Sequence, residues 1–130
     1  MAIIRSGRTT SKTVQITYEV LGDSTHDPLL LISGLGSQLV YWTDALCQVF
    51  LKRSFQVIRF DNRDVGLSTK TPGPAATMAE VLQGQGGPPP YTLSDMAADT
   101  GGTLDDLGIE SAHGLGVSLG GGIAQAMARE

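Results

Sequence analysis

The sequence predicts an α/β protein with a mostly parallel sheet and helices on both faces. Short apolar segments of strand length alternate along the chain with longer segments of helical periodicity. Glycine, proline or short polar stretches separate most of these segments. Strands that alternate with helices in this way form parallel sheets with helices packed on the two faces. The length of 130 residues suits a single domain.

The first expected elements are strands. Residues 2–21 are expected to form a hairpin, whose second strand alternates apolar and polar side chains over residues 14–19, as a half-exposed strand does. The next strand covers residues 29–33 (LLLIS), a largely apolar run between a proline and a glycine. Such a run is typical of a central strand that is covered on both faces.

A helix and a further strand follow. An apolar stripe at helical spacing predicts a helix over about residues 38–53, with Ser37 as its N-cap. Residues 55–61 (FQVIRFD) are expected to form a second buried strand. The segment 70–91 is rich in proline and glycine, so we expect an insert with one helical turn near Met78–Leu82.

The next helix is expected over residues 93–107. Thr92 and Asp95 have the spacing of a capping box, and Gly108 is a plausible stop signal. The pair Gly101–Gly102 lies inside this helix, and each glycine is expected to cost about 1 kcal/mol relative to alanine.

The last strand and helix are expected over residues 112–118 and 119–130. They meet at a G-x-S-x-G sequence made by Gly116, Ser118 and Gly120. A serine on so tight a strand-to-helix turn needs very small residues two positions before and after it. The alternative is a glycine-rich structural turn with an incidental serine.

Several other functions are disfavoured by the sequence. Both glycine-rich turns, GLGSQL and GLGVSL, lack the third glycine of a dinucleotide-binding loop. The net charge is −4 and there is no run of basic residues, so the sequence offers no basic surface for nucleic acid or an anionic membrane. No apolar run is long enough to span a bilayer. The single cysteine, Cys47, excludes an internal disulfide and fits a reducing compartment, so a cytoplasmic location is expected.

Three stretches together resemble one known family. They are LLLISGLGSQLVYW, VIRFDNRDVGLST, and the long segment that ends in the G-x-S-x-G turn. The chain is similar to the N-terminal half of α/β-hydrolase-fold enzymes, close to their esterase and methylesterase branch. The resemblance implies a serine hydrolase that acts on small-molecule carboxylic esters, without a metal or cofactor.

The resemblance also implies roles for particular residues. Ser118 would be the nucleophile, and the backbone N–H groups of Leu119 and Leu35 would form the oxyanion hole. Gly34 and Gly36 would shape the turn around Leu35, where Ser33 stands in place of the histidine of many relatives. The resemblance further implies that three polar residues organise the neighbouring loop rather than react: Asp61, Arg63 and Asp64.

The general base is not apparent in this sequence. By strand geometry, His113 would lie about 16 Å from Ser118, and His26 would lie at the opposite end of the sheet. In the family the acid and histidine follow the nucleophile, so we expect them beyond Glu130 and the chain to be part of a longer enzyme. The last strand would then be an exposed edge, open to a second chain or to self-association.

Two alternatives stay open at this point. A non-catalytic binding or assembly module could retain Ser118 only as part of its turn. Another α/β-hydrolase-fold chemistry, such as perhydrolysis, could use the same half of the fold.

Overall fold

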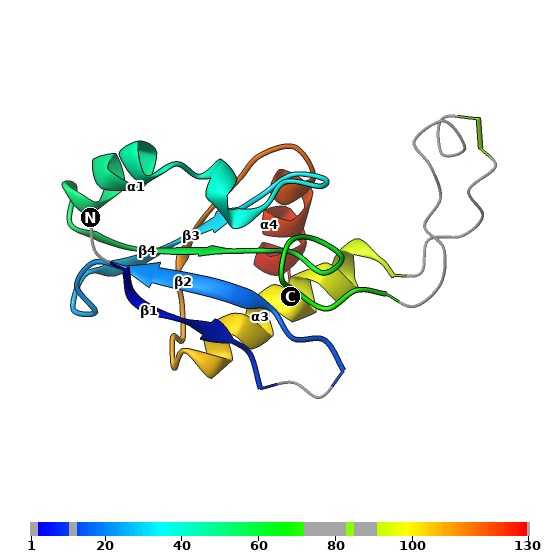
Figure 1. The fold of residues 1–130 in the computed structure, drawn as a ribbon, viewed down its shortest axis with the longest axis horizontal. Helices are drawn as coiled ribbons and strands as arrows, with labels where there is room; N and C mark the ends of the chain where they lie inside the picture. The colour runs from blue at the N-terminus through cyan, green and yellow to red at the C-terminus, as the bar shows by residue number, and fades with distance from the viewer. Residues whose placement is uncertain (1–2, 11–12, 72–82, 85–90, 130) are drawn as a thin grey trace.

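The computed structural model describes residues 3–10, 13–71, 83–84 and 91–129. The expected alternation of strands and helices is confirmed (Figure 1). The elements are β1 (Ile3–Arg8), β2 (Thr17–Leu21), β3 (Asp27–Ile32), a 3-10 turn η1 (Leu39–Tyr41), α1 (Asp44–Leu51), β4 (Phe55–Phe60), α3 (Leu93–Asp106), β5 (His113–Gly116) and α4 (Leu119–Arg129).

The sheet has the strand order β1-β2-β4-β3-β5. β1 pairs with β2, and β2 with β4, in antiparallel fashion. β3 pairs in parallel with β4 on one side and with β5 on the other, with Ile32 beside Gly116. The parallel part of this mixed sheet therefore brings the carboxyl ends of three strands to one edge, where ligands of open α/β sheets bind.

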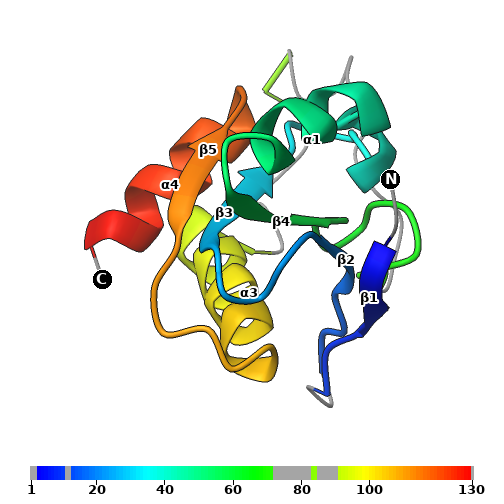
Figure 2. The same cartoon turned by 90° about the vertical axis from the view of Figure 1, so that its left-hand side faces the viewer.

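Helices cover both faces of the sheet, as expected. Figure 2 shows α1 on one side of the sheet and α3 on the other. In β3 the buried side chains alternate between the faces, since successive residues of a strand point to opposite sides. Leu29 and Leu31 pack with Trp42 and Cys47 on the α1 side. Leu30 and Ile32 face α3 and α4, where the larger cluster includes three helical residues: Met96, Leu104 and Ile123.

The helix expected over residues 38–53 is wrong in its extent and its cap. The chain forms the short η1 and then α1, which Thr43 caps by accepting a hydrogen bond from the Leu46 amide at 3.2 Å. Ser37 lies in the preceding turn and caps nothing. The break arises because distant side chains bind the backbone here: the Asp61 carboxylate accepts from the Leu39 amide.

The helix α3 is continuous through its two adjacent glycines. Its expected capping box is present: the Thr92 hydroxyl accepts from the Asp95 amide at 3.1 Å, and the Asp95 carboxylate accepts from the Thr92 amide at 2.8 Å. The helical turn expected near residues 78–82 lies outside the described residues. Among the helices that the structure describes, none combines the length and hydrophobicity needed to span a bilayer.

Candidate active site

Ser118 occupies the tight turn between β5 and α4. Its φ angle is +56°, in the left-handed region that L-residues with a side chain rarely adopt. The serine is exposed to solvent at the first turn of α4. A strained, exposed serine at this edge of a parallel sheet is the backbone geometry of a nucleophile elbow.

The two flanking glycines are required by close backbone contacts. A Cβ on Gly116 would lie 2.1 Å from the carbonyl oxygen of Gly120. A Cβ on Gly120 would lie 2.1 Å from the carbonyl oxygen of Ile32, at the end of the neighbouring strand β3. Real Cβ atoms do not approach backbone so closely, so the turn can pack against β3 only with glycine at both positions.

The loop 33–39, which follows β3, lies directly beside the serine. A Cβ on Gly34 would be 3.4 Å from the Cβ of Ser118. The Ser37 amide donates to the Gly34 carbonyl at 3.2 Å and closes a turn in which Gly36 has a φ of +70°. The tip of the turn is Leu35, whose residue surface is 71% exposed. The sequence-predicted Leu35 and Ser118 are therefore brought to one place.

Two backbone amides at this place are unpaired. Among the described residues, the N–H groups of Leu35 and Leu119 donate to no protein acceptor. The Leu119 amide is at the N-terminus of α4, where the first N–H groups of a helix have no intrahelical partner and carry a partial positive charge. Both amides are therefore free to bind a negatively charged oxygen.

A polar loop after β4 supports the 33–39 loop. The buried carboxylate of Asp61 accepts from the Leu39 amide at 2.6 Å and from the Leu67 amide at 3.0 Å. The side-chain amide of Asn62 donates to the Ser33 carbonyl at 3.2 Å. Asp61 thus connects the 33–39 loop to the loop after β4.

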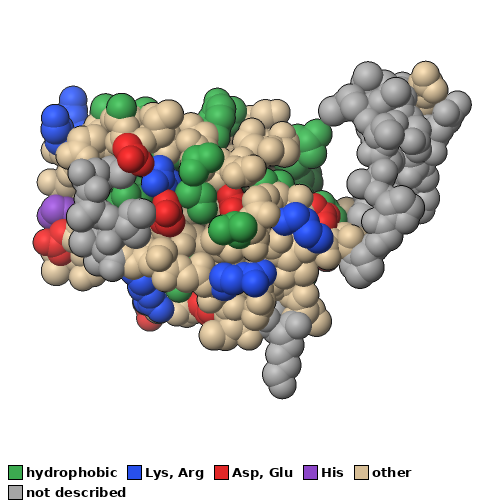
Figure 3. Space-filling view, in the orientation of Figure 1, with side chains coloured by type: hydrophobic (Ala, Val, Ile, Leu, Met, Phe, Trp, Pro, Cys, Tyr) green, Lys and Arg blue, Asp and Glu red, His purple; other side chains and the backbone are tan. Residues whose placement is uncertain are grey.

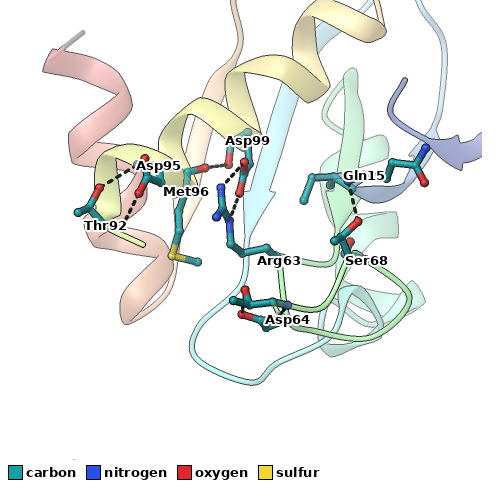
Figure 4. Close-up of polar contacts among 12 residues, drawn as sticks. Gln15, Arg63, Asp64, Ser68, Thr92, Asp95, Met96 and Asp99 are labelled. Carbon is teal, nitrogen blue, oxygen red and sulfur yellow. Dashed lines mark hydrogen bonds and ion pairs between the residues drawn. The ribbon is translucent and has the colours of Figure 1, made fainter. Parts of the chain in front are cut away.

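Arg63 reaches the middle of α3 instead, and Asp64 binds Tyr91, which precedes that helix. Figure 4 shows Arg63 reaching across to Asp99, with which it makes two hydrogen bonds of 2.6 and 2.8 Å. The Arg63 guanidinium also stacks over the Tyr91 ring, 4.6 Å from its centre. The hydrogen bond from the Tyr91 hydroxyl to Asp64 adds to the effect of burial, and together they raise the pKa of Tyr91 to about 12.

These elements line a cavity of about 540 Å³ that is open to solvent. Its walls are the tip of the 33–39 loop, the loop after β4, the beginning of α3 and the first residue of α4. Much of the wall is apolar: Leu35, Val65, Leu93, Met96 and Leu119.

Elsewhere, hydrophobic side chains reach the surface over η1 and α1 (Figure 3), where Val40, Tyr41 and Val49 are exposed.

Both histidines lie at the other end of the strands. His113 begins β5 beside Leu29 and contacts the Phe55 ring, with centres 5.8 Å apart. His26 precedes β3, and its amide donates to the Asp23 carbonyl. Ser118 lies beyond the last residue of β5, so neither imidazole is at its edge of the sheet. Within the described residues, no group of side chains could hold a metal ion.

Sequence reasoning missed four residues that shape the site. Trp42 donates from its indole N–H to the Ser33 hydroxyl at 3.0 Å, and Asn62 binds the Ser33 carbonyl. Tyr91 lines the cavity beside Arg63, and Asp99 holds the Arg63 guanidinium from α3. Asn62 lies inside the recognised stretch VIRFDNRDVGLST, and Trp42 ends the stretch LLLISGLGSQLVYW, which is a usable signal. No spacing or periodicity singles out Trp42, Tyr91 or Asp99 as residues of the site.

The chain is similar in sequence to known proteins. The α/β hydrolase fold family matches residues 27–130. The chain is 32% identical over 119 residues to rhodomycin D methylesterase DnrP of Streptomyces peucetius, covering 92% of this chain and 36% of that protein. It is 30% identical over 122 residues to a putative carbamate hydrolase RutD of Caulobacter segnis, covering 92% of this chain and 40% of that protein.

Solved structures agree. A hydrolase from Pseudomonas aeruginosa PA01 superposes with a TM-score of 0.74 and 30% identity, covering 96% of this chain and 41% of that one. The enol-lactonase from Burkholderia xenovorans LB400 superposes with a TM-score of 0.72 and 25% identity, covering 94% and 41%. The chain thus spans well under half the length of these proteins. Its fold and its similarity over residues 27–130 place this chain in the α/β-hydrolase family.

Proposed function

We propose that this protein is a serine hydrolase that cleaves carboxylic esters through an acyl-enzyme on Ser118. The observation that carries the proposal is the left-handed backbone of Ser118, beside two unpaired amides. Residues with a side chain rarely adopt a φ of +56°, and here such a residue directly precedes the N-terminus of α4. The methylesterase, carbamate hydrolase and enol-lactonase among the similar proteins support hydrolysis at a carbonyl group.

The proposed reaction has two steps. The Ser118 hydroxyl loses its proton to a base and its oxygen attacks the ester carbonyl carbon, which gives a tetrahedral intermediate. The N–H groups of Leu35 and Leu119 donate to the new oxyanion, which also lies at the positive end of the α4 dipole. The alcohol leaves with the proton. Water then attacks the acyl-enzyme in the same way, and the carboxylic acid is released.

We further propose that residues outside 1–130 supply the base and its orienting acid. His26 and His113 are at the opposite end of the sheet from Ser118, and an imidazole must reach hydrogen-bond distance to act. The source is either more of the same polypeptide or a second chain. The exposed edge of β5 supports both, since Leu115 and the following Val117 are more than a third exposed there.

The cavity supports an apolar, uncharged group on the ester. Its wall carries the leucine, valine and methionine side chains named above, and the charge of Arg63 is already neutralised by Asp99. An additional carboxylate on the substrate would therefore lose water without gaining a free cation.

A cytoplasmic location is part of the proposal and is supported by the one cysteine, Cys47, which is buried and unpaired.

The test is covalent labelling of the serine. The natural polypeptide that carries this sequence would be treated with a fluorophosphonate, and its intact mass and its turnover of p-nitrophenyl butyrate would be measured. We expect one adduct and ester turnover, both lost in Ser118→Ala and both retained in Ser111→Ala, which changes another exposed serine. Equal turnover by the unsubstituted protein and Ser118→Ala would instead support a non-catalytic binding or assembly module. The same experiment on residues 1–130 alone tests whether the base lies outside them.

A further inference from the structure

The residue that leads into the Leu35 turn is held on two sides. Ser33 is fully buried, and only Gly34 separates it from Leu35. Its hydroxyl accepts a hydrogen bond from the Trp42 indole at 3.0 Å, and its carbonyl accepts one from the Asn62 side chain at 3.2 Å. Water has no access to Ser33 to replace either bond, so the two donors fix the rotation of its backbone and side chain.

The far end of the same loop is held as well. The Leu39 amide donates to the Asp61 carboxylate at 2.6 Å, and the Ser37 amide donates to the Gly34 carbonyl. The loop is thus fixed at both ends and closed in the middle. Only its tip, with the unpaired Leu35 amide, makes no bond to the described protein. The direction of that amide is therefore set by the anchors.

One of the anchors is itself secured from the sheet. The carbonyl of Trp42 accepts a hydrogen bond from the Arg59 guanidinium on β4. That guanidinium also pairs with Glu19 on β2 at 2.8 Å and with Asp44 on α1 at 3.1 Å. Trp42 and Asn62 are 2% and 3% exposed, so the whole support is packed inside the protein. Its rigidity comes from β2, β4 and α1 rather than from the loop.

We propose that Trp42 and Asn62 are positioning residues for the proposed ester hydrolysis, because through Ser33 they aim the Leu35 amide at the position of the oxyanion. The inference rests on the proposed function. An oxyanion forms only in the transition state, and misplacement of one donor by a fraction of its bond length weakens that interaction without weakening substrate binding. Trp42 does not line the cavity; Asn62 does, but it is only 3% exposed and its side-chain amide is bonded to the Ser33 carbonyl.

The experiment compares Trp42→Phe and Asn62→Ala in the natural polypeptide. For p-nitrophenyl butyrate we expect kcat to fall about 10-fold with KM within about twofold, since only the transition state loses stabilisation. The dissociation constant of butylboronic acid, whose serine adduct is tetrahedral, should rise by the same factor as kcat falls. Thr9→Val is the control: it removes a buried hydrogen bond to the Ile16 amide, in the distant N-terminal hairpin.

A third variant separates the hydrogen bond from the bulk of the indole. Ser33→Ala deletes a single oxygen and so removes the same hydrogen bond as Trp42→Phe. If Trp42→Phe fails to fold, the same fall in kcat is expected in Ser33→Ala. The two changes together should lower kcat little more than either alone, because they remove one shared interaction. Unchanged kcat in folded Ser33→Ala and Asn62→Ala, or a kcat loss equal to that of Thr9→Val, would overturn the proposal.

Failure of the proposed function has a different signature. If the unsubstituted protein shows no turnover that depends on Ser118, the esterase proposal fails. The positioning of the loop is then read from amide hydrogen exchange at Ser37 and Leu39, whose N–H groups are bonded in the loop. Exchange should be about 10-fold faster in Trp42→Phe and Asn62→Ala than in Thr9→Val. Equal exchange in all three variants overturns the inference by itself.

Discussion

The Arg63 guanidinium and the Asp99 carboxylate form a two-pronged ion pair, with Nε 2.6 Å from Oδ2 and Nη2 2.8 Å from Oδ1. The side chains are 17% and 12% exposed. The pair joins the loop after β4 to the middle of α3, and residues of both segments line the cavity. Because the fork geometry is specific to arginine and carboxylate, the pair fixes these two segments relative to one another.

Removing one charge of this pair should destabilise the protein. Asp99→Asn leaves the partly buried Arg63 without its counter-ion, and we expect the free energy of unfolding to fall by about 2 kcal/mol, between the values for exposed and buried pairs. Urea denaturation of the natural polypeptide measures this loss in the free energy of unfolding. Asp105→Asn, the same change at an exposed site of the same helix, should cost less than about 0.5 kcal/mol. Equal losses in the two variants would show that the pair contributes nothing.

The sequence predicted features whose causes are local. The capping box needs only Thr92 and Asp95, three residues apart, and the elbow needs only its serine and two glycines. Such features can be recognised because the residues that cause them are neighbours in the chain. The elements on either side followed from hydrophobic periodicity, which is also local.

Features caused by distant residues were not predictable. The helix expected over residues 38–53 is interrupted because Asp61 and Arg59, from another strand and its loop, bind backbone groups at Leu39 and Trp42. Asp99 lies 36 residues from its partner Arg63. A hydrophobic pattern carries no signal of which polar side chain will meet which backbone group across such separations.

The Tyr91 hydroxyl predicts a loss of stability at high pH. Burial and the hydrogen bond to Asp64 raise its pKa to about 12 in the folded protein, whereas an unfolded tyrosine titrates near pH 10. Between these values the unfolded state releases the proton first, so the stability from this group, complete below about pH 10, is lost as the pH rises toward 12. Tyr91→Phe should decline less steeply than the unsubstituted protein in urea titrations at about pH 9 and 11. Parallel declines would contradict the assignment.

The glycines of the elbow differ sharply in what they tolerate. Alanine at position 116 or 120 would place its Cβ 2.1 Å from a backbone oxygen, so we expect either variant to lose more than about 3 kcal/mol or to fail to fold. Gly121 is the matched control, because a Cβ there meets nothing closer than the Gly116 carbonyl oxygen at 3.6 Å. Gly121→Ala should be neutral or stabilising by up to about 1 kcal/mol. Thermal denaturation ranks the three, and an intact elbow in Gly120→Ala would refute the close packing on β3.

The strain at Ser118 predicts an inversion of the usual preference for alanine over glycine. At a φ of +56° a Cβ is unfavourable, and glycine removes it, so Ser118→Gly should be more stable than Ser118→Ala by about 1 kcal/mol although both lack the hydroxyl. At the exposed Ser111, which is not among the residues with positive φ, the order should reverse, because glycine there only increases the freedom of the unfolded chain. Urea denaturation gives the free energy of unfolding of the glycine and alanine variants at each position. The glycine-minus-alanine difference at 118, less that at 111, measures the backbone strain. If alanine is the more stable replacement at both positions, the serine is unstrained, and the main support for a catalytic elbow is lost.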